Sequence, residues 1–175
     1  MIKIPKETSR ARTHPDSINP PLNEENIMGL FDKVSQTRQE TDVRLGPAEA
    51  FAAIALIAVA ADGYINDSES KAISMTLSRM QLFRSYPDDV MRKMLDRLLM
   101  ILQRQGVEVL FKAALETLPD ELKETVFAVT TDIALADGEV SEEEEQLLND
   151  LYGALGISEE VALNIIDVML IKNKG

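Results

Sequence analysis

The sequence contains no cysteine and no tryptophan, and it has a single histidine. Without cysteine the chain can form no disulfide, thiolate metal site or thiol nucleophile, so any metal it binds needs oxygen ligands. His14 lies among prolines, more than thirty residues before the first motif described below, so no Ser-His or Cys-His pair is expected. The eight glycines are scattered singly and form no phosphate-binding fingerprint. We expect no catalytic residues and predict that the protein is not an enzyme.

Aromatic residues are also scarce, at 5% of a chain that is 45% hydrophobic. The apolar residues are mostly Ala, Leu, Ile, Val and Met, which favours packed helices over a sheet sandwich. The longest apolar run, Ala50 to Ala61, is shorter than the roughly 20 residues that a membrane-spanning helix needs. We therefore predict an all-α domain with one core and no membrane span.

Basic residues are few towards the end of the chain. The net charge is -12, and residues 119–175 alone hold 14 acidic and 3 basic side chains. A field of this sign repels nucleic acid and attracts divalent cations or basic partners, so we expect no DNA or RNA binding. The alternative is that an acidic surface only keeps a helical domain in solution.

The chain divides into three parts. Residues 1–27 hold four of the seven prolines and predict a mobile tail, and Met1 to Ser9 are not followed by an apolar region. We therefore expect no secretory signal and a cytoplasmic protein. Residues 28–46 predict an amphipathic helix, and residues 47–173 a compact bundle, which makes about seven to eight helices in all.

Helices are expected in this bundle at about 47–61, 66–82, 87–104, 106–117, 120–136, 141–155 and 158–172. Pro47, Pro87 and Pro119 stand where first helical turns begin. Three glycines are expected to mark breaks or helix ends: Gly106, Gly153 and Gly156. The helix over 47–61 is apolar on nearly every side and should be the most buried.

A shift of 75 residues places Ala61-Asp62-Gly63 on Ala136-Asp137-Gly138. In both copies a β-branched residue and a glutamate follow at the same spacing: Ile65 and Glu69, Val140 and Glu144. Each copy follows an apolar helix and precedes an amphipathic one. We predict two pseudo-repeated units of helix, Asp-Gly turn and helix, over 47–104 and 120–173.

The spacing in these turns explains part of the pattern without any ligand. Gly63 and Gly138 can take positive φ where the first helix ends. Asn66 and Ser141 are suited to helix N-caps, and the glutamate three residues later completes a capping box.

The second half of an EF-hand loop also fits, with glycine sixth and glutamate twelfth. Its first and third ligand positions, however, hold apolar residues in both copies: Ala58 and Ala60, Ile133 and Leu135. A standard EF-hand is therefore excluded.

Two interpretations of the acidic residues remain open. If the two units pack face to face, Asp62, Glu69, Asp137 and Glu144 converge and can bind a hard divalent cation such as Ca²⁺ or Mg²⁺. Otherwise they are ordinary helix-cap residues, and the helix dipole favours their negative charge. Asp132 is added to the candidates because a carboxylate inside an apolar helix needs a partner, which is a Lys or Arg, a hydroxyl such as that of Thr130, or an ion.

The doubled segment, with Ile133 to Ser141 reading Ile-Ala-Leu-Ala-Asp-Gly-Glu-Val-Ser, resembles the tellurite-resistance TerB-like family. That family includes the amino-terminal domain of membrane-anchored DnaJ-like co-chaperones, and the resemblance covers about 47–173. It implies an all-helical cytoplasmic protein with a role in metal or oxyanion stress and without catalytic activity. It also implies cation binding at the four acidic positions and docking of other proteins at the inner membrane face.

A competing hypothesis is a metal-free interaction module centred on the helix expected over 87–104. Three basic residues lie close to one stripe of it, Lys93, Arg97 and Arg104, beside an apolar face of Val90, Met94, Leu98, Ile101 and Leu102. The helix also holds three methionines, which can line an adaptable groove or fill the core. Alternatively, the basic residues simply pair with acids of the second unit.

Overall fold

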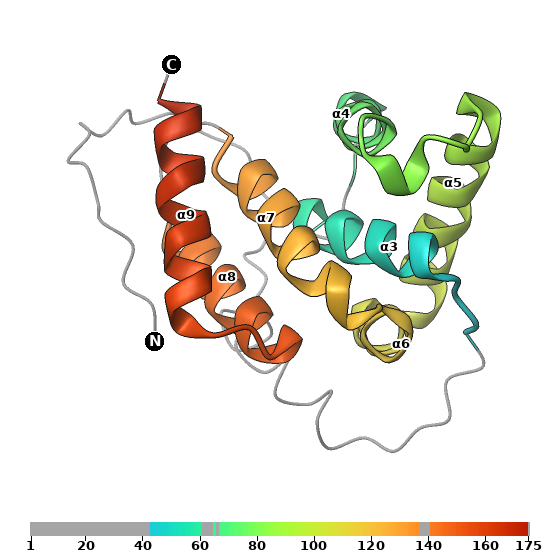
Figure 1. Cartoon of the computed structure of the whole chain (residues 1–175). Coiled ribbons are helices and arrows are strands. Elements are labelled where there is room, and N and C mark those ends of the chain that lie inside the picture. Colours follow the sequence, from blue (N-terminus) through green and yellow to red (C-terminus); the bar gives the residue numbers. More distant parts are fainter. Residues whose placement is uncertain (1–42, 61–64, 66, 137–140, 175) are drawn as a thin grey trace, which may run out of the picture.

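Seven α-helices make up the part of the chain that the structure, a computed structural model, describes: residues 43–60, 65, 67–136 and 141–174 (Figure 1). Of residues 67–69 and 143 only the backbone is described. The helices are α3 (Pro47–Val59), α4 (Asp67–Ser78), α5 (Asp88–Gln105), α6 (Val107–Thr117), α7 (Lys123–Ala134), α8 (Glu142–Leu155) and α9 (Glu159–Asn173), with short 3₁₀ turns at Gln81–Phe83 and Asp120–Leu122.

The described ranges contain no β-strand, which confirms the predicted all-α class. None of their helices is both long and apolar enough to cross a membrane. The predicted tail over 1–27 and all but the last four residues of the helix expected over 28–46 lie outside the described residues, and Val43 to Gly46 are not helical.

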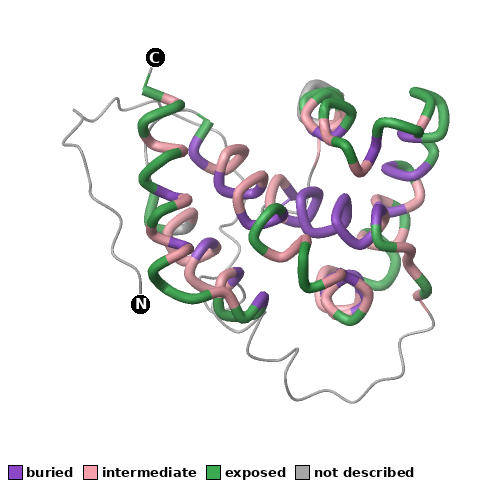
Figure 2. Tube along the Cα trace, in the orientation of Figure 1, coloured by how far each residue is buried: buried purple, intermediate pink, exposed green. Residues whose placement is uncertain are grey.

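Helix α3 is the centre of the bundle. It contacts α4, α5, α6 and α7, and its residues from Ala50 to Ile57 are all buried (Figure 2). Pro47 occupies the first turn as predicted, and the Glu49 carboxylate accepts a hydrogen bond from the Gly46 amide at 2.8 Å. Because every side of α3 is apolar, neighbours can cover all of it, and this confirms the prediction that it is the most buried helix.

Helix α5 buries part of the apolar face that its sequence predicted. Its buried residues are Met91, Met94, Leu95 and Leu98, whereas Val90 is 39% exposed. Of the predicted apolar face, Met94 and Leu98 are thus buried, Ile101 and Leu102 are half-buried, and Val90 is exposed. Helix α5 packs against α3, α4 and α6.

The glycines at the helix ends behave as predicted with one exception. Gly106 separates α5 from α6 with φ of 87°, and Gly156 ends α8 in the left-handed conformation with φ of 68°. Gly153 was expected to mark a break, but it lies inside α8, which continues to Leu155. The helix ends where the backbone becomes left-handed, and Gly156 is the residue that provides this.

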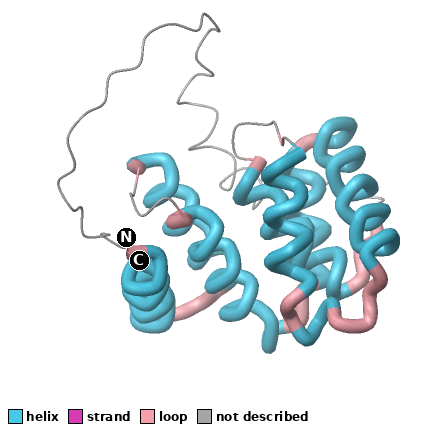
Figure 3. The backbone as a smooth tube through the Cα atoms, turned by 90° about the horizontal axis from the view of Figure 1, so that it is seen from above, coloured by secondary structure: helices cyan, strands magenta, loops and turns pink. Residues whose placement is uncertain are grey.

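The helices that follow α6 pack in a second group. Helix α7 contacts α3 on one side and α8 and α9 on the other, and α9 stands at the edge of the bundle in both views (Figures 1 and 3). Helices α4 and α8 begin at Asp67 and Glu142, which keeps the 75-residue shift. Both Asp-Gly turns, with Gly63 and Gly138, lie outside the described residues, so the equivalence of the two units stays a prediction.

Candidate functional site

The structure places two of the five predicted acidic ligands with their side chains, Asp132 and Glu144. Asp62 and Asp137 lie outside the described residues, and Glu69 is described only as part of the α4 backbone. Among the side chains that are described, no three carboxylate, histidine or cysteine groups lie close enough to share a metal ion. The convergence of Asp62, Glu69, Asp137 and Glu144 therefore stays a prediction.

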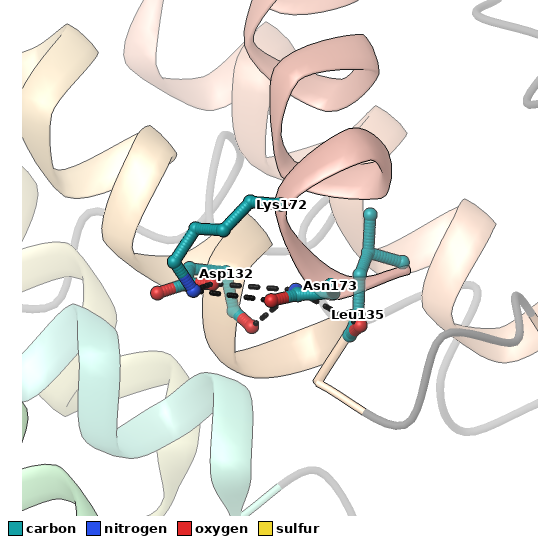
Figure 4. Close-up of polar contacts among 4 residues, drawn as sticks. All are labelled: Asp132, Leu135, Lys172 and Asn173. Carbon is teal, nitrogen blue, oxygen red and sulfur yellow. Dashed lines mark hydrogen bonds and ion pairs between the residues drawn. The ribbon is translucent and has the colours of Figure 1, made fainter. Parts of the chain in front are cut away.

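Asp132 lies near the end of α7, where it is held by the last turn of α9 (Figure 4). Lys172 Nζ donates to Asp132 Oδ1 at 2.7 Å, and Asn173 Nδ2 lies 3.3 Å from the same oxygen. The Asp132 side chain is 27% exposed and that of Lys172 is 57% exposed. The sequence left three kinds of partner open for Asp132: a basic side chain, a hydroxyl or an ion. The structure shows a basic side chain, that of Lys172.

Asn173 is a residue that sequence analysis did not identify. Its side-chain amide donates to the main-chain oxygen of Leu135 at 3.0 Å and lies 3.4 Å from that of Asp132. Both carbonyls lie at the C-terminal end of α7, where main-chain oxygens have no partner within the helix. Asn173 thus caps α7 from another helix, 38 residues away from Leu135. Nothing local in the sequence indicates this contact.

Thr130, the hydroxyl suggested as a partner for Asp132, has a different environment. It is fully buried, and its Oγ1 atom has no hydrogen-bond partner among the described residues. The neighbouring Thr131 is also fully buried, but its hydroxyl donates to the Phe127 carbonyl at 2.8 Å. Asp132 and Thr130 are therefore not paired.

Glu144 forms the capping box that its spacing predicted. Its Oε2 atom accepts from the Ser141 amide at 2.8 Å, and its own amide lies 3.1 Å from Ser141 Oγ. Two amides that the first turn of α8 leaves unpaired are satisfied in this way. The equivalent box at Asn66 and Glu69 lies outside the described side chains.

Two basic residues of α5, Lys93 and Arg97, are paired within the first half of the domain. Arg97 forms an ion pair with Glu49 of α3 and donates to the Arg44 carbonyl at 2.9 Å, while Lys93 lies 3.4 Å from Asp89 of its own helix. Pairing of Lys93 and Arg97 with acids of the second unit was therefore wrong. Glu49 is nearer because α3 and α5 pack directly against each other.

Glu49, Lys93 and Arg97 border a hollow of about 410 Å³ between the start of α3 and α5. Its apolar lining comes from Pro47, Ala48, Tyr86, Val90 and Met94, and its charged rim from Glu49, Lys93 and Arg97. Of the three methionines in α5, Met91 and Met94 are buried in the core and Met100 is 49% exposed. Only Met94 reaches the hollow, so the methionines mostly fill the core.

One described carboxyl has a perturbed pKa, and its cause is a surface contact. A hydrogen bond from Lys123, and then the charge of the same ammonium group, lower the pKa of Asp120. The two groups are 2.6 Å apart at the beginning of the short turn before α7. This is a local ion pair at a helix start.

Comparison with known families decides what this bundle is. The sequence model of one protein family, tellurite resistance protein TerB, matches residues 48–165. These residues extend from the first turn of α3 into α9 and include both Asp-Gly segments. The chain belongs to the TerB family. No curated protein and no solved structure matches it significantly. The resemblance seen in the doubled Ala-Asp-Gly motif is thus confirmed at the level of the family.

Proposed function

We propose that this TerB family protein acts in tellurite or metal resistance without catalysing a reaction, by binding a divalent cation and docking other proteins in the cytoplasm. Its membership of the TerB family over residues 48–165 carries the proposal. Because the chain has no cysteine, a direct reduction of tellurite by thiols is excluded, and its role is sensing, binding or assembly.

The proposed cation site lies at the two Asp-Gly turns. Asp62 and Asp137 occupy the same position in the repeated motif, and the last third of the chain supplies most of the negative charge. Oxygen ligands of this kind suit Ca²⁺ and Mg²⁺. Asp132 and Glu144 already have protein partners, so we expect them to position the turns, with any coordination by them secondary to that of Asp62 and Asp137.

Isothermal titration calorimetry of chelator-treated protein tests the cation site, with Ca²⁺ first and then Mg²⁺ and Zn²⁺. We expect binding at micromolar or tighter affinity that the double variant Asp62→Asn, Asp137→Asn loses. The matched control is Asp88→Asn, Asp96→Asn on α5, which removes the same charge elsewhere and should bind normally. Absence of heat with every ion would leave the carboxylates as helix caps.

The resistance role is tested separately in the native host. Deletion of the gene is expected to lower the tellurite concentration at which the cells grow, and the Asp62→Asn, Asp137→Asn variant should fail to restore it. Unchanged growth after deletion would remove the resistance role while leaving the calorimetric result intact.

The hollow beside α5 favours a second candidate function, a metal-free interaction module. It combines exposed apolar surface at Val90 with the half-exposed side chain of Arg97, and arginine is enriched at docking surfaces. A photo-crosslinking side chain at Val90 is expected to capture a protein in cells, whereas one at the exposed Glu116 on α6 should not. Capture that persists in chelator would favour this function over the cation-linked one.

A further inference from the structure

The longest stretch of the sequence without an acidic residue covers most of α4 and the turn that follows it. Residues 70–87 contain no Asp or Glu and three basic residues, Lys71, Arg79 and Arg84, in a chain of net charge -12. Helices α8 and α9, which hold many of the acidic residues, lie at the other end of the bundle from α4 (Figure 1). Beyond its first turn, α4 is therefore a cationic element of an acidic protein.

Three residues spaced four apart form a stripe on the outer side of this element, and we call them the α4 stripe: Lys71, Met75 and Arg79. Residues four apart lie on one face of a helix, and Arg79 directly follows the last residue of α4. All three are exposed, Met75 by 62%, whereas Ile73 and Leu77 on the inner side are buried. At about 1.5 Å per residue, the two cationic residues are about 12 Å apart along the helix, with the methionine between them.

The α4 stripe lines a hollow of about 370 Å³ between α4 and the start of α5. Ser74, Ser78 and Asp88 complete its lining. The Ser78 hydroxyl donates to the Ser74 carbonyl at 2.7 Å, and its oxygen can still accept a hydrogen bond. The hollow thus has cations and an apolar side chain on α4, and oxygen acceptors for the amides of a bound backbone.

The cations of the α4 stripe are not engaged by the described part of the chain. Neither the Lys71 ammonium nor the Arg79 guanidinium forms a hydrogen bond or an ion pair with a described residue. Elsewhere in the described ranges, ion pairs hold the side chains of Lys93, Arg97, Lys112, Lys123 and Lys172. A carboxylate that approaches the α4 stripe therefore breaks none of these ion pairs.

We propose that the α4 stripe binds a short, extended, acidic segment of another protein, which carries an apolar residue between two carboxylates. This rests on the proposed docking of other proteins, and it names the surface and the chemistry of the ligand. In an extended chain every second side chain points to the same side, and residues four apart are about 13 Å apart. That length matches the distance of about 12 Å between Lys71 and Arg79, so each cation meets a carboxylate while the apolar residue packs on Met75.

The charge of the whole molecule selects a short segment over a larger polyanion. Charges are screened over about 8–10 Å in physiological salt, which is less than the length of the α4 stripe. A nucleic acid or an anionic membrane extends further and meets acidic residues of the neighbouring helix, such as Asp89 and Asp96 of α5. A short segment contacts mainly α4 and avoids this repulsion.

Fluorescence anisotropy with the full chain and labelled short peptides tests the proposal. The first peptide holds Glu-Ser-Leu-Ser-Glu between neutral residues. We expect saturable binding that the double variant Lys71→Glu, Arg79→Glu weakens at least about tenfold, because two attractions become repulsions. The control variant Arg44→Glu, Arg104→Glu makes the same change of charge at exposed residues outside the α4 stripe and should bind normally. Circular dichroism of both variants shows whether the fold is kept.

Two further peptides test the charge and the spacing. A peptide with Lys-Ser-Leu-Ser-Lys should bind the Lys71→Glu, Arg79→Glu variant more tightly than the unchanged protein. A peptide with Ser-Glu-Glu-Leu-Ser should bind the unchanged protein at least about threefold more weakly than the first peptide, because adjacent carboxylates of an extended chain point to opposite sides.

Three results would overturn the proposal: no binding of the first peptide, equal binding by the two double variants, or equal binding of the two glutamate peptides. Binding of the full chain to phosphatidylserine vesicles that Lys71→Glu, Arg79→Glu abolishes would also overturn it, since the α4 stripe would then recognise a membrane. Calorimetry of the Asp62 and Asp137 variant and crosslinking at Val90 probe other residues, so their results stand whichever way the peptide measurement falls.

Discussion

Two adjacent threonines of α7 differ in how their buried hydroxyls are satisfied. Thr131 donates to the Phe127 carbonyl, whereas Thr130 Oγ1 has no partner in the described part of the chain. A buried polar group without a hydrogen bond costs about 1–3 kcal/mol, and valine has nearly the same shape as threonine. We therefore expect Thr130→Val to raise the free energy of unfolding by about 1 kcal/mol.

Thr131→Val is the matched control, since it should leave stability unchanged or lower it by up to about 1 kcal/mol. Urea denaturation of the two variants measures the difference. A loss of stability in Thr130→Val would mean that its hydroxyl is hydrated or otherwise bonded in solution.

The contact between Asp132 and Lys172 joins α7 to α9 at the residue scale. Because the lysine is 57% exposed, water screens the pair, and we expect it to contribute only about 0.5–1 kcal/mol. A double-mutant cycle with Asp132→Asn and Lys172→Met measures this coupling by chemical denaturation.

The same variants separate the two roles considered for Asp132. If Asp132 only holds α9 in place, Asp132→Asn should lower stability equally with and without divalent cations. A loss of stability that appears only in the presence of Ca²⁺ or Mg²⁺ would instead identify Asp132 as a metal ligand.

At the scale of an element, α8 has one glycine inside it and one at its C-terminal end, and the two have opposite expected responses. Gly153 lies inside the helix, and a methyl group added there meets no atom within 4 Å. Gly153→Ala should therefore stabilise the protein by about 0.5–1 kcal/mol, because alanine loses less backbone entropy in a helix. Gly156 has φ of 68°, so Gly156→Ala should destabilise it by about 1–2 kcal/mol.

Thermal unfolding of the two alanine variants measures both effects on one helix. Equal effects of the two substitutions would contradict the assignment of Gly156 as the end of α8. The sequence predicted the end of α8 through Gly156, but it did not distinguish this glycine from Gly153. Their difference is conformational, since both are exposed and neither is crowded.

At the scale of the whole molecule, charge is the property most open to experiment. The net charge is -12, and acidic side chains outnumber basic ones by 14 to 3 in residues 119–175. Repulsion of this kind destabilises a compact state and is screened by salt. We expect the melting temperature to rise as monovalent salt is added up to physiological ionic strength.

A melting temperature that falls with added salt would mean that ion pairs such as Arg97 with Glu49 outweigh the repulsion. The salt series is also the reference for the calorimetry, because a divalent cation screens charge without any site. Stabilisation by Ca²⁺ beyond that of an equal ionic strength of monovalent salt would indicate specific binding.

What the sequence determined by itself was the local structure. The apolar helix that begins at Pro47, the capping box of Ser141 and Glu144 and the helix end at Gly156 all depend on residues within a few positions of one another. The Ala-Asp-Gly motif, which occurs twice, indicated the family for the same reason, because each copy is a pattern of a few neighbouring residues.

Tertiary structure decided which distant residues meet. Lys172 and Asn173 bind the end of α7, Arg97 binds Glu49, and Val90 is turned towards solvent. These contacts join residues about 40 or more positions apart, or depend on how far α5 is rotated against α3 and α6. Local spacing specifies which side of a helix is apolar, but only the packing of complete helices against one another determines how that side is oriented and what it touches.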